Sequence, residues 1–150
     1  SNSRTVFHPN SYGLHTPASP HLSAQLDGVR IELSKIVRPT TDNTLIIEAA
    51  GGLYVPLNDE DTMLDLILPT DKVVIVSRHY LGSINHTMLT YEALKNKGLN
   101  VHGIIFSGTS TPSTEEFILH KTGLPVLLRI DEEPYFDKQV VKEYASKLKI

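Results

Sequence analysis

Residues 44–57 read Thr-Leu-Ile-Ile-Glu-Ala-Ala-Gly-Gly-Leu-Tyr-Val-Pro-Leu, and this stretch decides how the chain is interpreted. Leu45, Ile46 and Ile47 form a continuous apolar run, which suits a strand buried on both faces of a parallel sheet. The run ends at Glu48, and four residues with little or no side chain follow it. Beyond the end of a strand, a carboxylate can hold a metal and glycines let the backbone approach an anion. A solvated Glu48 before a glycine turn explains the same residues, so the stretch alone leaves both interpretations open.

The composition sets limits on the kind of protein. The 150 residues fit a single α/β domain spanning residues 1–150, of which residues 1–3 are expected to be a tag or truncation scar. A formal net charge of −3 gives no general attraction to nucleic acid or to an anionic membrane. No apolar run approaches the roughly 18–20 residues of a membrane span. Without cysteine there is no disulfide or thiolate metal site, so we expect a cytoplasmic enzyme.

Four continuous apolar runs alternate with amphipathic segments. The runs predict strands near residues 44–48, 72–77, 101–106 and 125–130. Strands that alternate with helices form a parallel sheet, because the helical crossover carries the chain back to the edge where the next strand begins. We therefore expect an α/β fold with a mostly parallel sheet and helices on both faces.

Capping residues predict three helices in the second half of the chain. We expect helices over residues 84–97, from 113 to 121, and after residue 137. The last helix has a predicted buried side made of Val140, Val141, Tyr144, Ala145 and Leu148. The residues expected to begin or end these helices are Ser83, Gly98, Ser113 with Glu116 as a capping box, Gly123 and Asp137.

Residues 3–20 are rich in turn formers and predict an irregular segment. Ser19 is a good N-cap and Pro20 suits the first helical position, so a short helix is expected there, ending at Gly28. His21 could contact a ligand from that helix end, but by itself it is more simply a solvated histidine.

Two further segments follow before the second apolar run. Residues 31–37 predict a short helix. Residues 58–61 read Asn-Asp-Glu-Asp and are acidic enough to suggest a metal site. Acidic residues before a helix are more simply explained by capping and by the helix dipole, so we interpret this run as structural.

Three motifs in this order resemble those of dethiobiotin synthases, enzymes of the biotin pathway. EAAGG at residues 48–52, followed by Pro56, is similar to the family's Glu-Gly-Ala-Gly-Gly motif. LGSINH at residues 81–86 matches Leu-Gly-x-Ile-Asn-His, and SPH at residues 19–21 matches Ser-Pro-His. The resemblance covers about residues 5–148.

The resemblance implies a P-loop NTPase-like homodimer that uses ATP, or another nucleoside triphosphate, together with Mg²⁺. The family closes a ureido ring on the diamine 7,8-diaminopelargonic acid with carbon dioxide, through a phosphorylated carbamate. Glu48 would be the catalytic residue and the magnesium ligand. The substrate would meet Ser19, Pro20 and His21 together with Gly82, Ser83, Ile84 and Asn85, the last four across the dimer interface. The nucleotide would meet Glu48, Gly51, Gly52, Ser107, Gly108, Ile130 and Asp131.

The sequence also departs from the family pattern. No Gly-x-x-x-x-Gly-Lys-Thr loop occurs in the 150 residues, whereas the family carries one after its first strand. We expect the chain to be the C-terminal two thirds of such a domain, or a protein lacking the loop, and we expect these residues alone not to turn over ATP. Ser107 replaces the family's base-reading Asn, and LRID at residues 128–131 replaces Gly-x-Ile-Pro. A preference for adenine is therefore not implied.

Two alternative functions stay open on the sequence. One is another P-loop amidoligase or a partition-type ATPase, and the other is a non-catalytic binding or dimerisation module. The paired SPH and LGSINH motifs favour dethiobiotin synthase over the first alternative. The missing phosphate loop favours the non-catalytic module, unless the chain is truncated.

Overall fold

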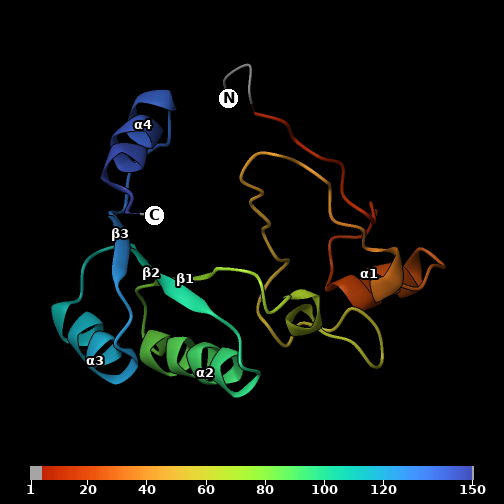
Figure 1. Cartoon of the computed structure of the whole chain (residues 1–150), viewed down its shortest axis with the longest axis horizontal. Coiled ribbons are helices and arrows are strands. Elements are labelled where there is room, and N and C mark those ends of the chain that lie inside the picture. The colour runs from red at the N-terminus through yellow and green to blue at the C-terminus, as the bar shows by residue number, and fades with distance from the viewer. Residues whose placement is uncertain (1–4, 150) are drawn as a thin grey trace. The chain divides into compact units, whose positions relative to one another are not determined.

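The computed structural model describes residues 5–149, which fall into two compact units (Figure 1). The first unit is Ser1–Ile67 and the second is Leu68–Ile150. The tag expected at residues 1–3 lies outside the described residues. Each unit has buried apolar residues of its own, so each is described by itself.

The second unit is built on a three-stranded parallel sheet (Figure 1). Its strands are β1 (Val73–Arg78), β2 (Val101–Ser107) and β3 (Val126–Ile130), in the spatial order β1-β2-β3. Both neighbouring pairs run parallel. The strands predicted near residues 72–77, 101–106 and 125–130 are confirmed, and with them the α/β class.

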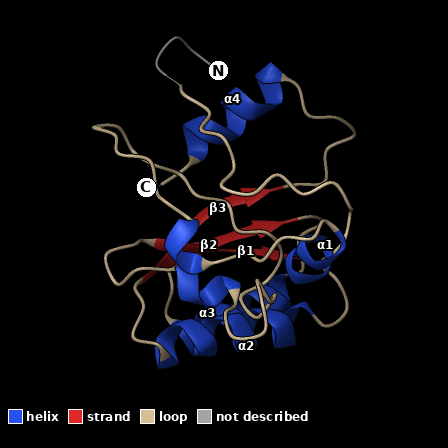
Figure 2. Ribbon diagram, turned by 90° about the vertical axis from the view of Figure 1, so that its right-hand side faces the viewer, coloured by secondary structure: helices blue, strands red, loops and turns tan. Residues whose placement is uncertain are grey.

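Three helices accompany this sheet. They are α2 (Ser83–Asn96), α3 (Pro112–Thr122) and α4 (Lys138–Lys147). Figure 2 shows α2 and α3 on one side of the sheet and α4 on the other. On the α2 and α3 side, apolar residues from strands and helices are removed from water, which is the main stabilising term of such a layer. The most deeply buried of them are Leu94, Ile104, Phe106 and Ile118.

The first unit has little regular structure. It contains α1 (Pro20–Leu26) and two short 3-10 helices, η1 (Leu33–Lys35) and η2 (Met63–Leu66). Its core is a small cluster of Ala24, Ile31, Leu57 and Met63. The predicted start of α1 is confirmed, with Ser19 at the N-cap and Pro20 at the first helical position.

The irregular segment before α1 is fastened to the end of that helix. The backbone N–H of His15 donates to Oδ2 of Asp27 at 2.8 Å, and Nδ1 of His15 lies 3.2 Å from the same oxygen. The hydroxyl of Ser23 donates to the carbonyl of Thr16 at 2.8 Å. The hydrogen bond from the His15 backbone lowers the pKa of Asp27, because it stabilises the charged carboxylate.

The strand predicted near residues 44–48 is wrong, because these residues form no regular structure. Ile46 is 86% exposed and Ile47 is 56% exposed. A β-branched run becomes a strand only when a neighbouring strand pairs with its backbone. The described residues of the first unit form no strand, so this run has no partner.

The short helix predicted over residues 31–37 is also wrong, and only the 3-10 turn η1 forms there. Ile31 is buried, and Leu33 and Ile36 pack against the core of the first unit. These three apolar residues are thus covered without a helix. Val37, at 76% exposed, takes no part in that packing.

Some helix ends of the second unit lie where the sequence predicts them, and others do not. Gly98 and Gly123 follow the ends of α2 and α3 as expected. The carboxylate of Asp137 caps α4 by accepting from the N–H groups of Gln139 and Val140, which confirms that cap. The capping box expected at Ser113 with Glu116 is wrong, because α3 already begins at Pro112 and Thr111 is its N-cap. Proline favours the first helical position, so the N-cap is Thr111, two residues before the predicted Ser113.

The predicted buried side of α4 is wrong. No described residue of α4 is buried, and Val141 is 55% exposed. The helix touches β3, and its backbone continues to a hydrogen bond from the N–H of Lys149 to the carbonyl of Leu127 at 3.1 Å. An amphipathic pattern predicts that a helix has an apolar side, but burial of that side needs a surface over it.

No helix in residues 5–149 is long and apolar enough to cross a membrane.

The centre of the sheet generates the first prediction. A Cβ added at Gly103 would lie 2.6 Å from Cγ of Leu127, which is buried. We therefore expect Gly103→Ala to lower the free energy of unfolding by about 1–3 kcal/mol, the usual cost of overpacking. Gly13→Ala is the control, because nothing lies within 4 Å of a Cβ there. Urea unfolding measures both, and equal midpoints would contradict the packing of β2 against β3.

The fastening at Asp27 generates the second prediction. Because its pKa is lower in the folded state, the carboxylate stabilises that state above about pH 4, and the contribution is lost as pH falls through the folded pKa. Asp27→Asn carries no charge at any pH. We expect the wild type to be more stable than Asp27→Asn at pH 6 and the difference to vanish in acid. Asp42→Asn, at an exposed site, is the control and should follow the wild type. A difference that is the same at pH 6 and in acid would contradict this role.

Candidate active site

The carboxyl ends of the three parallel strands meet at one edge of the sheet. There the N–H of His79 donates to the carbonyl of Ser107 at 2.8 Å, and the N–H of Gly108 donates to the carbonyl of Ile130 at 2.9 Å. These bonds extend the pairing beyond the strands themselves. They bring together Ser107, Gly108 and Ile130, three of the residues predicted to meet the nucleotide.

Asp131 follows directly and is held by α4. Its N–H donates to the hydroxyl of Tyr144 at 3.0 Å, and that hydroxyl donates to Oε1 of Glu133 at 2.6 Å. The hydrogen bond to the Glu133 carboxylate raises the pKa of Tyr144, because a negative acceptor opposes loss of the phenolic proton. Tyr144, predicted as a core residue, therefore positions the backbone after β3.

A cluster around the buried carboxylate of Glu115, at the same edge, could not be predicted from the sequence. The Glu115 side chain is 6% exposed and lies beside His79 and Arg129. The His79 ring stacks on Phe106, with centroids 5.5 Å apart and planes 11° apart, and the Arg129 guanidinium lies 5.9 Å from the same Phe106 ring. The only sequence signal is a charged residue, Arg129, inside the apolar run of β3. It does not reveal the partners.

The turn between β1 and α2 carries the LGSINH motif. Gly82 is the N-cap of α2 with φ +101°, a conformation that side chains other than glycine rarely adopt. The expected cap at Ser83 is therefore wrong by one residue. Ser83 is the first helical residue, is buried, and donates its N–H to the carbonyl of Tyr80 at 3.0 Å.

Side chains on either side of this turn brace it. The hydroxyl of Tyr80 is hydrogen-bonded to Nδ1 of His86, and the two rings are stacked. The turn presents Leu81 fully exposed, with Ile84 partly exposed beside the free end of the helix. Helix geometry leaves the N–H groups of Ile84 and Asn85 without helical acceptors, so they can bind an anion.

In the first unit, two of the three motifs lie next to each other. The N–H of His21 donates to the carbonyl of Pro56 at 3.3 Å. This bond joins the SPH motif at residues 19–21 to the residue that closes the EAAGG motif. His21 itself is exposed, as the sequence suggested.

The EAAGG stretch is an exposed turn. Glu48 and Gly52 are exposed. Gly51 has φ +80°, and a Cβ there would lie 2.9 Å from Cγ2 of Val55, so the turn requires glycine at this position. The other end of the stretch is fixed by the N–H of Met63, which donates to the carbonyl of Val55 at 3.0 Å.

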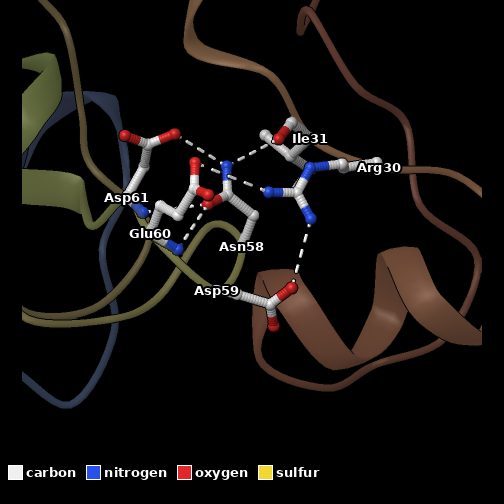
Figure 3. Close-up of polar contacts among 6 residues, drawn as sticks. All are labelled: Arg30, Ile31, Asn58, Asp59, Glu60 and Asp61. Atoms are coloured by element: carbon white, nitrogen blue, oxygen red, sulfur yellow. Dashed lines mark hydrogen bonds and ion pairs between the residues drawn. The ribbon is translucent and has the colours of Figure 1, made fainter.

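The acidic run at residues 58–61 folds around Asn58 (Figure 3). The amide nitrogen of Asn58 donates to the carbonyl of Ile31 and to Oδ2 of Asp61, both at 2.8 Å. Its amide oxygen accepts from the N–H groups of Glu60 and Asp61, at 2.8 and 2.9 Å. Asn58 therefore closes the turn and ties it to the core residue Ile31.

The remaining carboxylates of this run face a cation. Arg30 lies 3.2 Å from Asp59 and 3.8 Å from Glu60 (Figure 3). The cap of η2 comes from Thr62 and Asp65 rather than from the acidic run. In residues 5–149, no group of three or more His, Asp or Glu side chains is placed to hold a metal ion.

A family model described as an AAA domain matches residues 1–140. The chain is similar to the ATP-dependent dethiobiotin synthetase of Christiangramia forsetii, with 52% identity over 99% of this chain and 72% of that protein. It is 47% identical to the enzyme of the same name from Cytophaga hutchinsonii, over 96% of this chain and 71% of that protein. For the enzyme of Brucella anthropi, the identity is 41% over 90% of this chain and 64% of that protein.

Proposed function

Because this chain belongs to the dethiobiotin synthetase family, we propose that it is an ATP-dependent ligase that forms dethiobiotin in biotin biosynthesis. The observation that carries the proposal is the high identity to the named enzymes along nearly the whole chain. The AAA-domain match and the parallel sheet agree with the P-loop NTPase-like fold class expected from the sequence. A cytoplasmic location and a homodimer are part of the proposal.

The proposed reaction joins carbon dioxide to both amines of 7,8-diaminopelargonic acid. One amine attacks carbon dioxide and loses a proton, giving a carbamate. A carbamate oxygen takes the γ-phosphoryl group of ATP and releases ADP. The second amine then attacks the carbamoyl carbon, phosphate leaves, and the ureido ring closes. Such phosphoryl transfers need mainly positioning and electrostatic stabilisation from the protein.

The strand ends of the second unit are the proposed nucleotide side. Ligands of open α/β sheets bind at the carboxyl ends of the strands, where Ser107, Gly108, Ile130 and Asp131 lie. The two backbone bonds that join these ends support a fixed surface for the base. In the first unit, Gly51 and Gly52 are proposed to let the backbone approach the phosphates.

Glu48 is the proposed magnesium ligand and catalytic residue. Its carboxylate is exposed and stands beside a turn that only glycine can form, and magnesium on a nucleotide takes one or two carboxylates together with phosphate oxygens. A single exposed carboxylate fits this mode of binding, in which phosphate oxygens and water complete the coordination of the ion. When bound, Mg²⁺ would neutralise charge on the phosphates during transfer.

The diamine side is proposed to use two motifs. Ser19, Pro20 and His21 lie at the start of α1, against Pro56. The partner subunit would contribute its Gly82, Ser83, Ile84 and Asn85. The N–H groups of Ile84 and Asn85 would bind the substrate carboxylate, while the N–H of Ser83 is already bound to the carbonyl of Tyr80. The exposed Leu81 beside this turn supports a two-fold interface there, since its side chain would be covered by the partner.

Glu48→Gln tests the proposed function. In the complete protein, we expect the wild type to convert diamine, carbon dioxide and ATP to dethiobiotin with one phosphate released per ring. The variant should keep its melting temperature and lose activity by about tenfold or more, most severely at limiting magnesium. Glu92→Gln, an exposed carboxylate on α2, is the control. Absence of dethiobiotin with the wild type would refute the function, and full activity of Glu48→Gln would refute only the role of Glu48.

Gly82→Val tests the cross-subunit site. A β-branched residue cannot easily adopt φ +101°, so the turn should distort, with a stability loss of about 1–3 kcal/mol. Gly123→Val is the matched control, because it also forces a positive φ, of +66°, at a helix end with nothing within 4 Å. We expect only Gly82→Val to weaken dimerisation and diamine binding, measured by sedimentation and calorimetry. A wild type that is an active monomer, or equal diamine affinity in both variants, would contradict the shared site.

A further inference from the structure

Glu115 is a buried carboxylate on the first turn of α3 that joins three separate segments. Its Oε1 lies 3.1 Å from Nε2 of His79 and accepts from the hydroxyl of Ser110 at 3.3 Å. Its Oε2 accepts from Nε of Arg129 at 2.6 Å. The Glu115 and His79 side chains are 6% and 4% exposed, so these contacts are largely shielded from solvent.

The three partners come from the carboxyl ends of all three strands. His79 follows β1, Ser110 belongs to the loop after β2, and Arg129 is the next-to-last residue of β3. One carboxylate thus connects the ends that open-sheet proteins use to bind ligands.

The contacts to Glu115 also orient the His79 ring. Within residues 5–149, Nδ1 of His79 is buried without a hydrogen-bond partner. The bond to Glu115 is therefore the polar contact that fixes this ring, and stacking on Phe106 fixes its plane. The N–H of His79 donates to the carbonyl of Ser107, so a fixed His79 also fixes the end of β2.

Stability alone does not explain an ionic cluster at this place. A buried carboxylate paired with a half-exposed arginine is costly to remove from water, and such pairs usually add little compared with apolar side chains of the same volume. Directional contacts do something that apolar packing does not, since they hold each partner at one distance and angle. The contacts of Glu115 therefore fix the relative positions of His79, Ser110 and Arg129 at this edge of the sheet.

We propose that Glu115 is a positioning residue for nucleotide binding, which holds the loop at residues 107–111 in the shape that receives the base. The proposal rests on the proposed function. Glu115 acts through the loop: Ser110 ties the middle of the loop to the carboxylate, and His79 ties its start. Arg129, whose side chain is 52% exposed, ties the same carboxylate to β3.

Steady-state kinetics of Glu115→Gln in the complete protein tests the inference. The amide keeps the shape of the side chain but cannot accept from Arg129 and His79 as a charged partner does. We expect the KM for ATP to rise by roughly tenfold, as when an orienting partner is removed at other sites, with kcat and the KM for the diamine little changed. Glu116→Gln is the matched control, since Glu116 is the next residue of α3 and is exposed.

Two further measurements keep the test decisive. Hydrogen exchange of the nucleotide-free protein should be faster at residues 107–111 in Glu115→Gln than in Glu116→Gln, with α2 unchanged. If Glu115→Gln does not fold, Ser110→Ala tests the positioning role instead, because it removes only the hydrogen bond between the loop and Glu115. This variant should also raise the KM for ATP.

The outcomes separate the two proposals. A wild type that makes no dethiobiotin refutes the proposed function, while hydrogen exchange still decides whether Glu115 holds the loop. An active wild type with equal KM for ATP in Glu115→Gln and Glu116→Gln overturns the positioning role. So does a variant that loses kcat while both KM values stay unchanged, or unchanged exchange at residues 107–111.

Discussion

The parallel pairing of β1, β2 and β3 is the constraint on which the candidate site of the second unit depends. It brings three carboxyl ends to one edge, and two backbone hydrogen bonds continue the pairing past the strands, from His79 to Ser107 and from Gly108 to Ile130. The loops therefore start from fixed points. Polar side chains beyond those points can form one site, because these hydrogen bonds hold the backbone beneath them together.

Features that depend on short stretches of sequence could be predicted. The three strands of the sheet are continuous apolar runs, and Asp137 caps α4 through its own side chain, so neither needs knowledge of distant residues. The closeness of Ser107 and Ile130 could also be predicted, because parallel strands place their ends together. The family motifs added roles for these residues that the residues alone left open.

Features that depend on distant partners could not be predicted. The run at residues 44–48 has strand composition, but Ile46 is exposed, because the described residues of the first unit form no strand that could pair with it. The apolar side of α4 is clear in the sequence, yet nothing in the sequence says how much surface covers it. The contacts of Glu115 join residues that are 36 and 14 positions away, and no local pattern encodes them.

In the proposed nucleotide site, Ser107 stands where the family pattern has an asparagine, so the loop after β2 would take a larger part in recognising the base. An asparagine amide offers a donor and an acceptor in a planar group, whereas a serine hydroxyl rotates and has a single proton to donate. With serine at this position, more of the proposed recognition would fall to backbone groups of the loop. Backbone groups recognise a ligand only when the loop keeps its shape, because each flexible residue must be ordered at a cost on binding. The buried carboxylate of Glu115 connects Ser110 to Arg129 of β3 and to His79 after β1. It therefore orders the loop before the nucleotide binds, which lowers the entropy cost of binding.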